Sequence, residues 1–198
     1  MTIALPRGAV LNERYVVQEE LGRGTRGVVH AAKDLMAMRR VAIKILSNDA
    51  GPLGERLGAE LTSEAHALKH ARVPGVVRFL DEGRHDGMQY LVTELVDGIE
   101  FPGGVASAEK RAPGDAELKP LGRQLVGLAS TLRRVHALGM VHGDIKPQNV
   151  LVRSSTAECV LLDFGFSRLV RLAAKEGVSS GRVVGTPLYM APEMIGGY

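Results

Sequence analysis

The sequence contains no tryptophan, and aromatic residues make up only 4% of its 198 residues. It has a single cysteine, Cys159, which excludes a disulfide within the chain. Because Cys159 begins an apolar run over 159–162, we expect a buried, unreactive thiol in a core strand. No apolar run approaches the length of a membrane-spanning helix, and the first residues lack the apolar stretch of a signal peptide. We therefore expect a cytoplasmic protein.

An excess of charge of one sign is also missing. The 25 lysines and arginines nearly balance the 22 aspartates and glutamates, for a formal net charge of +3. Since no long basic run is present, we expect no nucleic-acid partner. Hydrophobic residues at 45% and charged residues at 24% are ordinary for a globular domain, and the length suffices for one sizeable domain.

The most informative stretch covers residues 142–152. It places a carboxylate (Asp144), an ammonium (Lys146) and a carboxamide (Asn149) close together in one polar loop that leads into an apolar strand. A carboxylate can accept a proton from a hydroxyl, a lysine can hold a phosphate, and an asparagine oxygen can ligate a hard cation. A second acidic group follows in Asp163-Phe164-Gly165. Phosphate chemistry with a divalent cation is the function that this set favours.

Three glycines follow an extended apolar stretch near the N-terminus, and they are Gly22, Gly24 and Gly27. Glycines at this spacing let backbone N–H groups approach phosphate oxygens closely. The same spacing marks dinucleotide-binding folds, which need a helix directly after the glycines. Here two extended runs follow instead, at 28–32 and 39–46. A strand, a glycine turn and a second strand disfavour a dinucleotide-dependent oxidoreductase.

Taken in chain order, the glycine motif, the later strand and the polar loop resemble the motifs of the protein kinase family, Ser/Thr type, in its bacterial, eukaryotic-like form. The family patterns are G-x-G-x-x-G-x-V, V-A-I-K, H-R-D-L-x-x-x-N, D-F-G and A-P-E. The matching segments are 22–29, 41–44, 142–149, 163–165 and 191–193. The resemblance runs from about Leu21 to Glu193, nearly the whole chain.

The resemblance implies an α+β fold of two lobes, with an antiparallel β-sheet and one main helix in the small lobe. We expect an N-terminal extension over 1–14, the small lobe and hinge over 15–96, and a partial, mainly helical large lobe over 97–198. Kinases of this family continue with further helices after the A-P-E motif. We therefore expect a kinase domain truncated soon after that motif.

Residues 55–72 have apolar residues at helical spacing and predict the main helix of the small lobe. The family pairs one glutamate of this helix with Lys44 of the V-A-I-K strand. Glu60 and Glu64 are both candidates, because residues four apart lie on neighbouring parts of one face. Periodicity does not decide between them. The alignment of 73–77 with the motif that usually ends this helix favours Glu64.

The resemblance also implies ATP and Mg²⁺ as ligands and a protein substrate with a serine or threonine acceptor. ATP contacts would come from Leu21, Gly22, Gly24, Gly27, Val29, Ala42, Lys44, Leu151 and the backbone of Glu94 and Val96. Asp144 would accept the hydroxyl proton, and Lys146 would steady the γ-phosphate. Asn149 and Asp163 would hold Mg²⁺, and Thr186 would support Asp144.

Gly143 stands where the family usually has an arginine that pairs with a phosphate on the activation loop. We therefore expect activity to depend little on phosphorylation of that loop, which contains Ser179 and Ser180. The truncation keeps a second interpretation open: a pseudokinase-like regulator that binds nucleotide without transferring phosphate.

The remaining patterns predict connecting elements. We expect a loop over 47–54, short strands over 76–80 and 88–94 joined by a polar turn over 81–87, and a flexible connection over 101–116. A helix should open at Pro120 and end near Gly139. A hairpin of 150–152 with 160–162 and a mobile loop over 166–184 complete the prediction.

Overall fold

The structure, a computed structural model, describes residues 5–24, 27–46, 52–102, 115–164, 168–169, 186–190 and 192. The chain forms two compact units. The first comprises Met1–His66 and Arg78–Leu95, and the second comprises Ala67–Val77 and Val96–Tyr198. The sequence predicted a single division after residue 96, whereas 67–77 groups with the second unit. The reason lies in the backbone, because Gly75 and Val77 both bond to Leu161.

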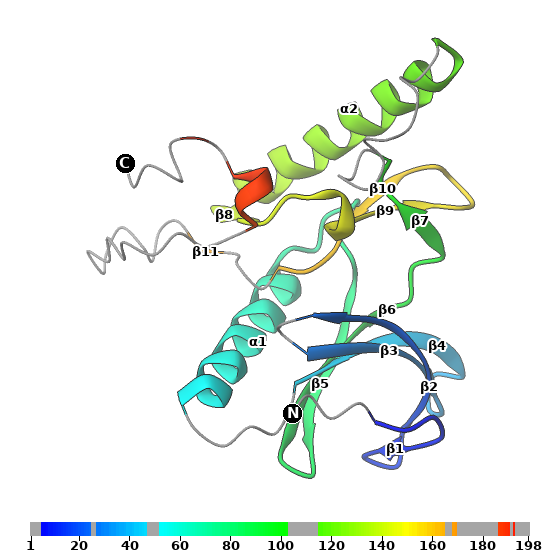
Figure 1. The fold of residues 1–198 in the computed structure, drawn as a ribbon, viewed down its shortest axis with the longest axis vertical. Coiled ribbons are helices and arrows are strands. Elements are labelled where there is room, and N and C mark those ends of the chain that lie inside the picture. The colour runs from blue at the N-terminus through cyan, green and yellow to red at the C-terminus, as the bar shows by residue number, and fades with distance from the viewer. Residues whose placement is uncertain are drawn as a thin grey trace. The chain divides into compact units, whose positions relative to one another are not determined.

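The first unit contains a six-stranded sheet in the order β1-β2-β3-β4-β6-β5, and every neighbouring pair of strands is antiparallel (Figure 1). The strands are β1 (Val10–Leu11), β2 (Tyr15–Gly24), β3 (Gly27–Asp34), β4 (Arg39–Ile45), β5 (Phe79–His85) and β6 (Met88–Glu94). Helix α1 (Pro52–His70) begins in this unit. The predicted antiparallel sheet with one main helix is therefore confirmed.

Residues along β4 alternate between the buried core and the opposite face of this sheet. Val41, Ile43 and Ile45 are buried in the apolar core of the unit, whereas the intervening Ala42 and Lys44 are only half-buried. Side chains of a strand point alternately to its two faces, so Ala42 and Lys44 share the opposite face from the core.

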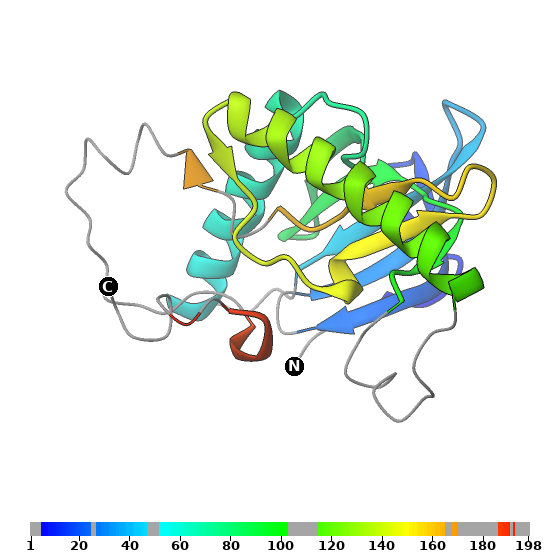
Figure 2. The same cartoon turned by 90° about the horizontal axis from the view of Figure 1, so that it is seen from above.

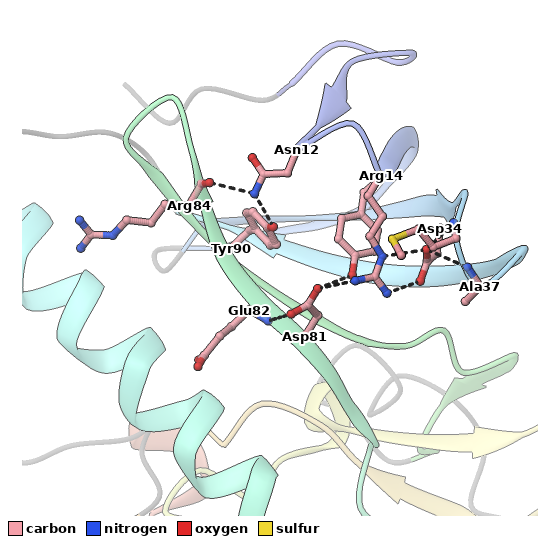
Figure 3. A network of polar contacts seen from close by, with 10 residues as sticks. Asn12, Arg14, Asp34, Ala37, Asp81, Glu82, Arg84 and Tyr90 are labelled. Atoms are coloured by element: carbon pink, nitrogen blue, oxygen red, sulfur yellow. Dashed lines mark hydrogen bonds and ion pairs between the residues drawn. The ribbon is translucent and has the colours of Figure 1, made fainter.

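A network of hydrogen bonds connects neighbouring strands at one end of the sheet (Figure 3). The guanidinium of Arg14 donates to both oxygens of Asp34 at 3.0 and 2.9 Å and to Asp81 at 2.9 Å. Tyr15 donates its hydroxyl to the same oxygen of Asp81 at 2.6 Å. The Arg14 hydrogen bonds lower the pKa of Asp34 to about 2, with help from backbone N–H donors in the β3–β4 turn. The network ties β2, β3 and β5 together.

The second unit combines a long helix with small sheets (Figures 1 and 2). Its elements are α2 (Asp115–Ala137), β7 (Gly98–Glu100), β8 (Met140–Val141), η2 (Pro147–Asn149), β9 (Val150–Arg153), β10 (Cys159–Leu161), β11 (Arg168–Leu169) and η3 (Pro187–Tyr189). Strands β10, β9 and β7 form one sheet, and β11 pairs with β8. The predicted hairpin of β9 and β10 is confirmed.

Helix α2 lies over the β9–β10 hairpin in Figure 2. The thiol of Cys159 lies 3.6 Å from the carbonyl oxygen of Gln124 in this helix. Burial raises the pKa of Cys159, in agreement with the predicted unreactive thiol. Gly139 follows the helix with φ +74°, and its N–H donates to the carbonyl of His136 at 2.8 Å. This left-handed glycine ends the helix as the sequence predicts.

Three predicted boundaries are wrong. Helix α1 begins at Pro52, inside the predicted loop, because proline fits a first helical position. Helix α2 begins at Asp115 and carries Pro120 inside, where only one N–H is lost near the helix start. Strand β5 covers Phe79–His85, so the turn shrinks to Asp86 and Gly87, both at positive φ.

Some predictions fall outside the described residues, including most of the loop over 166–184 and the side chain of Glu60. Among the residues that the structure describes, no helix is both long and apolar enough to cross a membrane.

Candidate functional site

The first unit brings Lys44 and Glu64 together. The ammonium of Lys44 lies 2.6 Å from Oε2 of Glu64, and the two side chains are 14% and 4% exposed. Strand β4 presents Lys44 on the face opposite the core, and α1 presents Glu64 toward it. Of the two glutamates that periodicity left open, Glu64 is therefore the one placed at the lysine. An ion pair this buried fixes the lysine in one position.

Other predicted nucleotide contacts share the face of Lys44. Cross-strand pairing sets Val29 of β3 directly opposite Lys44, and it sets Ala42 opposite Thr93 of β6. Residues directly opposite on neighbouring strands point to the same face of a sheet. Val29, Ala42 and Lys44 thus form one surface of the first unit. Glu94 ends β6, on the strand next to β4.

The three glycines lie at the end of the β2–β3 hairpin. Gly22 pairs with Val29, and Gly24 pairs with Gly27. Leu21, immediately before them, is 48% exposed. Gly27 has φ +126°, and a Cβ there would lie 2.2 Å from the carbonyl oxygen of Ile45, so no other residue fits without a backbone shift. A Cβ on Gly22 or Gly24 would meet nothing within 4 Å among the described residues, which leave the space beside this backbone open.

The second unit holds Asp144 in a set of hydrogen bonds. Oδ1 of Asp144 accepts from the backbone N–H of Thr186 at 3.1 Å and from its hydroxyl at 2.9 Å. Oδ2 lies 2.7 Å from the ammonium of Lys146 and accepts from the amide of Asn149 at 3.1 Å. Lys146 also donates to the hydroxyl of Thr186 at 2.8 Å. Four predicted site residues therefore meet at one point of the second unit.

The environment of Asp144 keeps it ionised. Burial by itself would raise the pKa of this carboxyl, which is only 5% exposed. Hydrogen bonds from Lys146, Thr186 and Asn149 outweigh burial and leave the pKa of Asp144 below its ordinary value. An ionised carboxylate is the form that can accept a proton.

Asn149 and Asp163 are linked through the backbone. The N–H of Leu162 donates to the carbonyl of Asn149 at 2.8 Å, which places the start of the 163–165 motif beside the polar loop that contains Asp144. The Asn149 amide nitrogen donates to Asp144, both to its backbone carbonyl and to its carboxylate. Its oxygen therefore remains available as an acceptor or a metal ligand. Asp163 has φ +50°, a left-handed conformation that is rare outside glycine but that aspartate tolerates.

The part that His142 plays was not predicted from the sequence. Its ring accepts the N–H of Asp144 at Nδ1 (3.3 Å), so Nε2 carries the proton and donates to the carbonyl of Leu162 at 2.8 Å. The ring also meets Phe164 edge-on, with centroids 4.7 Å apart. Burial lowers the pKa of His142, which favours this neutral form. The histidine joins the Asp144 loop to the 163–165 motif, and its position at the start of that loop was the only signal in the sequence.

The donor set suits Mg²⁺ bound together with phosphates. Among the described residues, no cluster of three or more histidine, cysteine, aspartate or glutamate side chains could hold a metal ion alone. Mg²⁺ commonly takes one or two carboxylates and completes its shell with water and phosphate oxygens. Asp163 and the Asn149 oxygen fit that requirement. Leu151, one of the predicted ATP contacts, is half-buried on β9 opposite Glu100 of β7. Val96 is buried, in the second unit.

Comparison with known proteins gives consistent relatives. The serine/threonine-protein kinase pkn2 of Myxococcus xanthus is 37% identical over 191 residues, which cover 95% of this chain and 22% of that protein. PknL of Mycobacterium tuberculosis is 32% identical over 190 residues, covering 94% and 45%. Myosin light chain kinase A of Dictyostelium discoideum is 30% identical over 183 residues, covering 91% and 58%. The chain thus spans less than two thirds of each of these relatives.

A family model described as the protein kinase domain matches residues 15–198. The match begins at the first residue of β2 and so includes the glycine hairpin, the Lys44–Glu64 pair and the Asp144 loop. Because it extends over nearly the whole sequence, the chain belongs to the protein kinase family.

Proposed function

We propose that the chain carries the catalytic machinery of an ATP-dependent protein serine/threonine kinase, with Asp144 as the base. The observation that supports this most is the buried, ionised Asp144, held at once by Lys146, Thr186 and Asn149. Family membership supplies the reaction class, and the names of the relatives supply the acceptor type.

The residues of the second unit divide the work around the acceptor hydroxyl. The Asp144 carboxylate accepts the hydroxyl proton, while Thr186 and Asn149 fix its orientation. Lys146 has three N–H donors, of which two are directed at Asp144 and Thr186. The third remains for a phosphate oxygen at the point where negative charge moves during transfer.

The first unit holds the nucleotide phosphates. Lys44 is kept in place by Glu64 and offers its charge to the α- and β-phosphates, and the glycine hairpin offers backbone N–H groups. Asn149 and Asp163 would hold Mg²⁺, which neutralises phosphate charge when bound. Val29 and Ala42 of the first unit would supply apolar contacts to the base.

The test is transfer of radiolabelled phosphate from ATP, with Mg²⁺, to a basic acceptor protein, followed by phosphoamino-acid analysis. Asp144→Asn keeps the size of the side chain but removes the base, so we expect the rate to fall about 10²- to 10⁴-fold. Asp86→Asn makes the same chemical change at an exposed turn and should leave the rate unchanged. Circular dichroism of each variant checks folding.

Equal rates for the original chain and Asp144→Asn would contradict the proposal, as would label on tyrosine alone. A folded chain that binds ATP without transferring phosphate would instead support the nucleotide-binding regulator.

A further inference from the structure

The turn between β3 and β4 exposes apolar side chains. Leu35 is 42% exposed, Met36 is 77% exposed and Met38 is 71% exposed. Figure 2 shows this turn projecting beyond the two strands that it joins. Single exposed apolar residues are normal on a protein surface, whereas residues that cluster mark contact sites. Three within one short turn therefore indicate a contact surface.

The fold holds this turn in one conformation. The Asp34 carboxylate accepts hydrogen bonds from the backbone N–H groups of Met36 and Ala37 at 3.0 and 3.1 Å (Figure 3). Asp34 is 1% exposed, and the guanidinium of Arg14 donates to both of its oxygens. The carbonyl of Arg14 also accepts the N–H of Leu35 at 2.9 Å. Because the backbone is already fixed, binding through these side chains would cost little ordering entropy.

The exposed charges that flank the turn are positive. Lys33 precedes it and Arg39 follows it, and both are exposed and form no ion pair within the described part of the chain. Asp34 lies directly opposite Arg39, so Lys33, one residue earlier, points to the other face of the hairpin. A third cation, Arg40, is paired with Glu19 of β2. Since Asp34 is buried, the turn and its flanks present apolar groups and cations together.

Size and charge select among the partners that this turn could contact. A stable protein interface buries about 800 Å² on each partner and takes about 20 to 30 residues a side, far more than one turn offers. A second copy of this chain, in a two-fold contact, would set the same cations against each other. An anionic lipid surface avoids both problems, because it accepts a small apolar wedge and attracts lysine and arginine to its phosphates.

We propose that the β3–β4 turn is a contact site for an anionic lipid surface. Leu35, Met36 and Met38 enter the boundary between headgroups and acyl chains, and Lys33 and Arg39 contact lipid phosphates from the two faces of the hairpin. Methionine suits this place because its flexible thioether adapts to irregular surroundings. The contact goes beyond the proposed function and does not depend on it, since it holds the chain at a membrane whether or not phosphate is transferred.

The test measures sedimentation of the full chain with vesicles of phosphatidylcholine, with and without phosphatidylserine. We expect binding to the anionic vesicles alone, and weaker binding at higher salt, because ions screen the attraction. Met36→Gln combined with Met38→Gln removes apolar groups at nearly constant size. Val126→Gln, on α2, changes an apolar residue that is as exposed as Met38, at 71%, and is the matched control.

For the double methionine variant we expect vesicle binding to weaken about tenfold, since each side chain is buried only in part. Lys33→Gln combined with Arg39→Gln should weaken it about 25-fold, or about fivefold for each cation. Lys119→Gln combined with Arg133→Gln removes the same charge from exposed positions of α2 and should change binding little. Circular dichroism and ADP affinity, which should match those of the original chain, check the folding of every variant.

Equal binding to both kinds of vesicle, or binding to neither, would overturn the inference. A double methionine variant that binds as the original chain does would also overturn it, because cations alone would then suffice. A dimer of the original chain in analytical ultracentrifugation that the methionine variant does not form would identify a second copy as the partner, against the inference. The transfer assay tests the proposed function separately from all of these outcomes.

Discussion

In the first unit, Lys44 and Glu64 meet at 2.6 Å from a strand and a helix, and the two residues lie 20 positions apart in sequence. In the second unit, Asp144 is held by Lys146 and Asn149 from its own loop and by Thr186 from 42 positions away. The first arrangement depends on how a helix packs on a sheet. The second depends mainly on the conformation of one short loop.

This difference determines how each half should respond to change. A helix can shift relative to a sheet, so the Lys44–Glu64 pair can be broken by motion of α1 without unfolding either element. The Asp144 loop is braced by His142 and by the backbone bond between Leu162 and Asn149. Small motions of one element would therefore leave the base in place. We therefore expect motion of α1 to change the activity, and we expect the position of Asp144 to stay the same.

The largest effect should come from Lys44→Met, which removes the charge that we propose to bind phosphate and takes its cation away from the buried Glu64. We expect kcat/KM for ATP to fall about 10²- to 10³-fold, as when a preorganised electrostatic donor is lost. Lys33→Met, on the neighbouring strand β3 and exposed, is the control. Unchanged activity of Lys44→Met would show that the Lys44–Glu64 pair is not required for phosphoryl transfer.

A smaller effect is expected in the second unit from Thr186→Ala. The change removes the hydroxyl that bonds to both Asp144 and Lys146, but the backbone N–H of residue 186 still reaches Asp144. Two bonds to charged groups are lost, but Lys146 keeps Asp144 as a partner and the backbone bond remains, so we expect kcat to fall about tenfold or somewhat more. Thr186→Ser should restore most of it. A loss as large as that of Asp144→Asn would mean that the loop is not braced as described.

Acid should affect the stability of the first unit through His30. This histidine is 3% exposed, and neither ring nitrogen has a hydrogen-bond partner in the described part of the chain. Its strand neighbours are Ile43 and the exposed Glu20, and burial lowers its pKa. The folded form therefore binds fewer protons than the unfolded form, so stability is full above the ordinary histidine pKa near 6.5 and decreases as pH falls below it.

Denaturant unfolding at a series of pH values measures this effect. His30→Leu cannot be protonated, so its free energy of unfolding should vary less with pH between about 7 and 5. His136→Leu, at an exposed position of α2, should retain the original pH dependence. A His30→Leu profile parallel to the original would rule out a contribution from the buried ring.

The smallest effect is expected from Ser179→Ala combined with Ser180→Ala. Gly143 has φ +84° and carries no cation that could pair with a phosphate on the activation loop. The phosphoryl-transfer rate should therefore stay within a few-fold of the original. Complete loss of activity, measured in the same transfer assay, would show that another cation serves the loop.

The sequence predicts most of the features that are formed by residues close together in the chain. The Asp144 loop, the β9–β10 hairpin and the end of α2 follow from residues close together in the chain, where turn and strand chemistry act directly. Periodicity could not choose between Glu60 and Glu64, because residues four apart are neighbours on any helix, whereas the ion pair of Glu64 with Lys44 depends on how α1 packs against β4. The hydrogen bond from the Arg78 N–H to the Glu94 carboxylate left no pattern either, since it needs the register that sets Arg78 opposite Glu94.

The conformation of Gly27 determines which glycines would be retained if the chain lost its activity during evolution. Its positive φ and the nearby Ile45 carbonyl require glycine for the hairpin itself, whether or not a nucleotide binds. A descendant that lost phosphoryl transfer would therefore keep Gly27, while Gly22 and Gly24, which have open space around them, would be free to drift. Under the proposed function, Gly22 and Gly24 are the two of the three glycines that would record selection for phosphate binding.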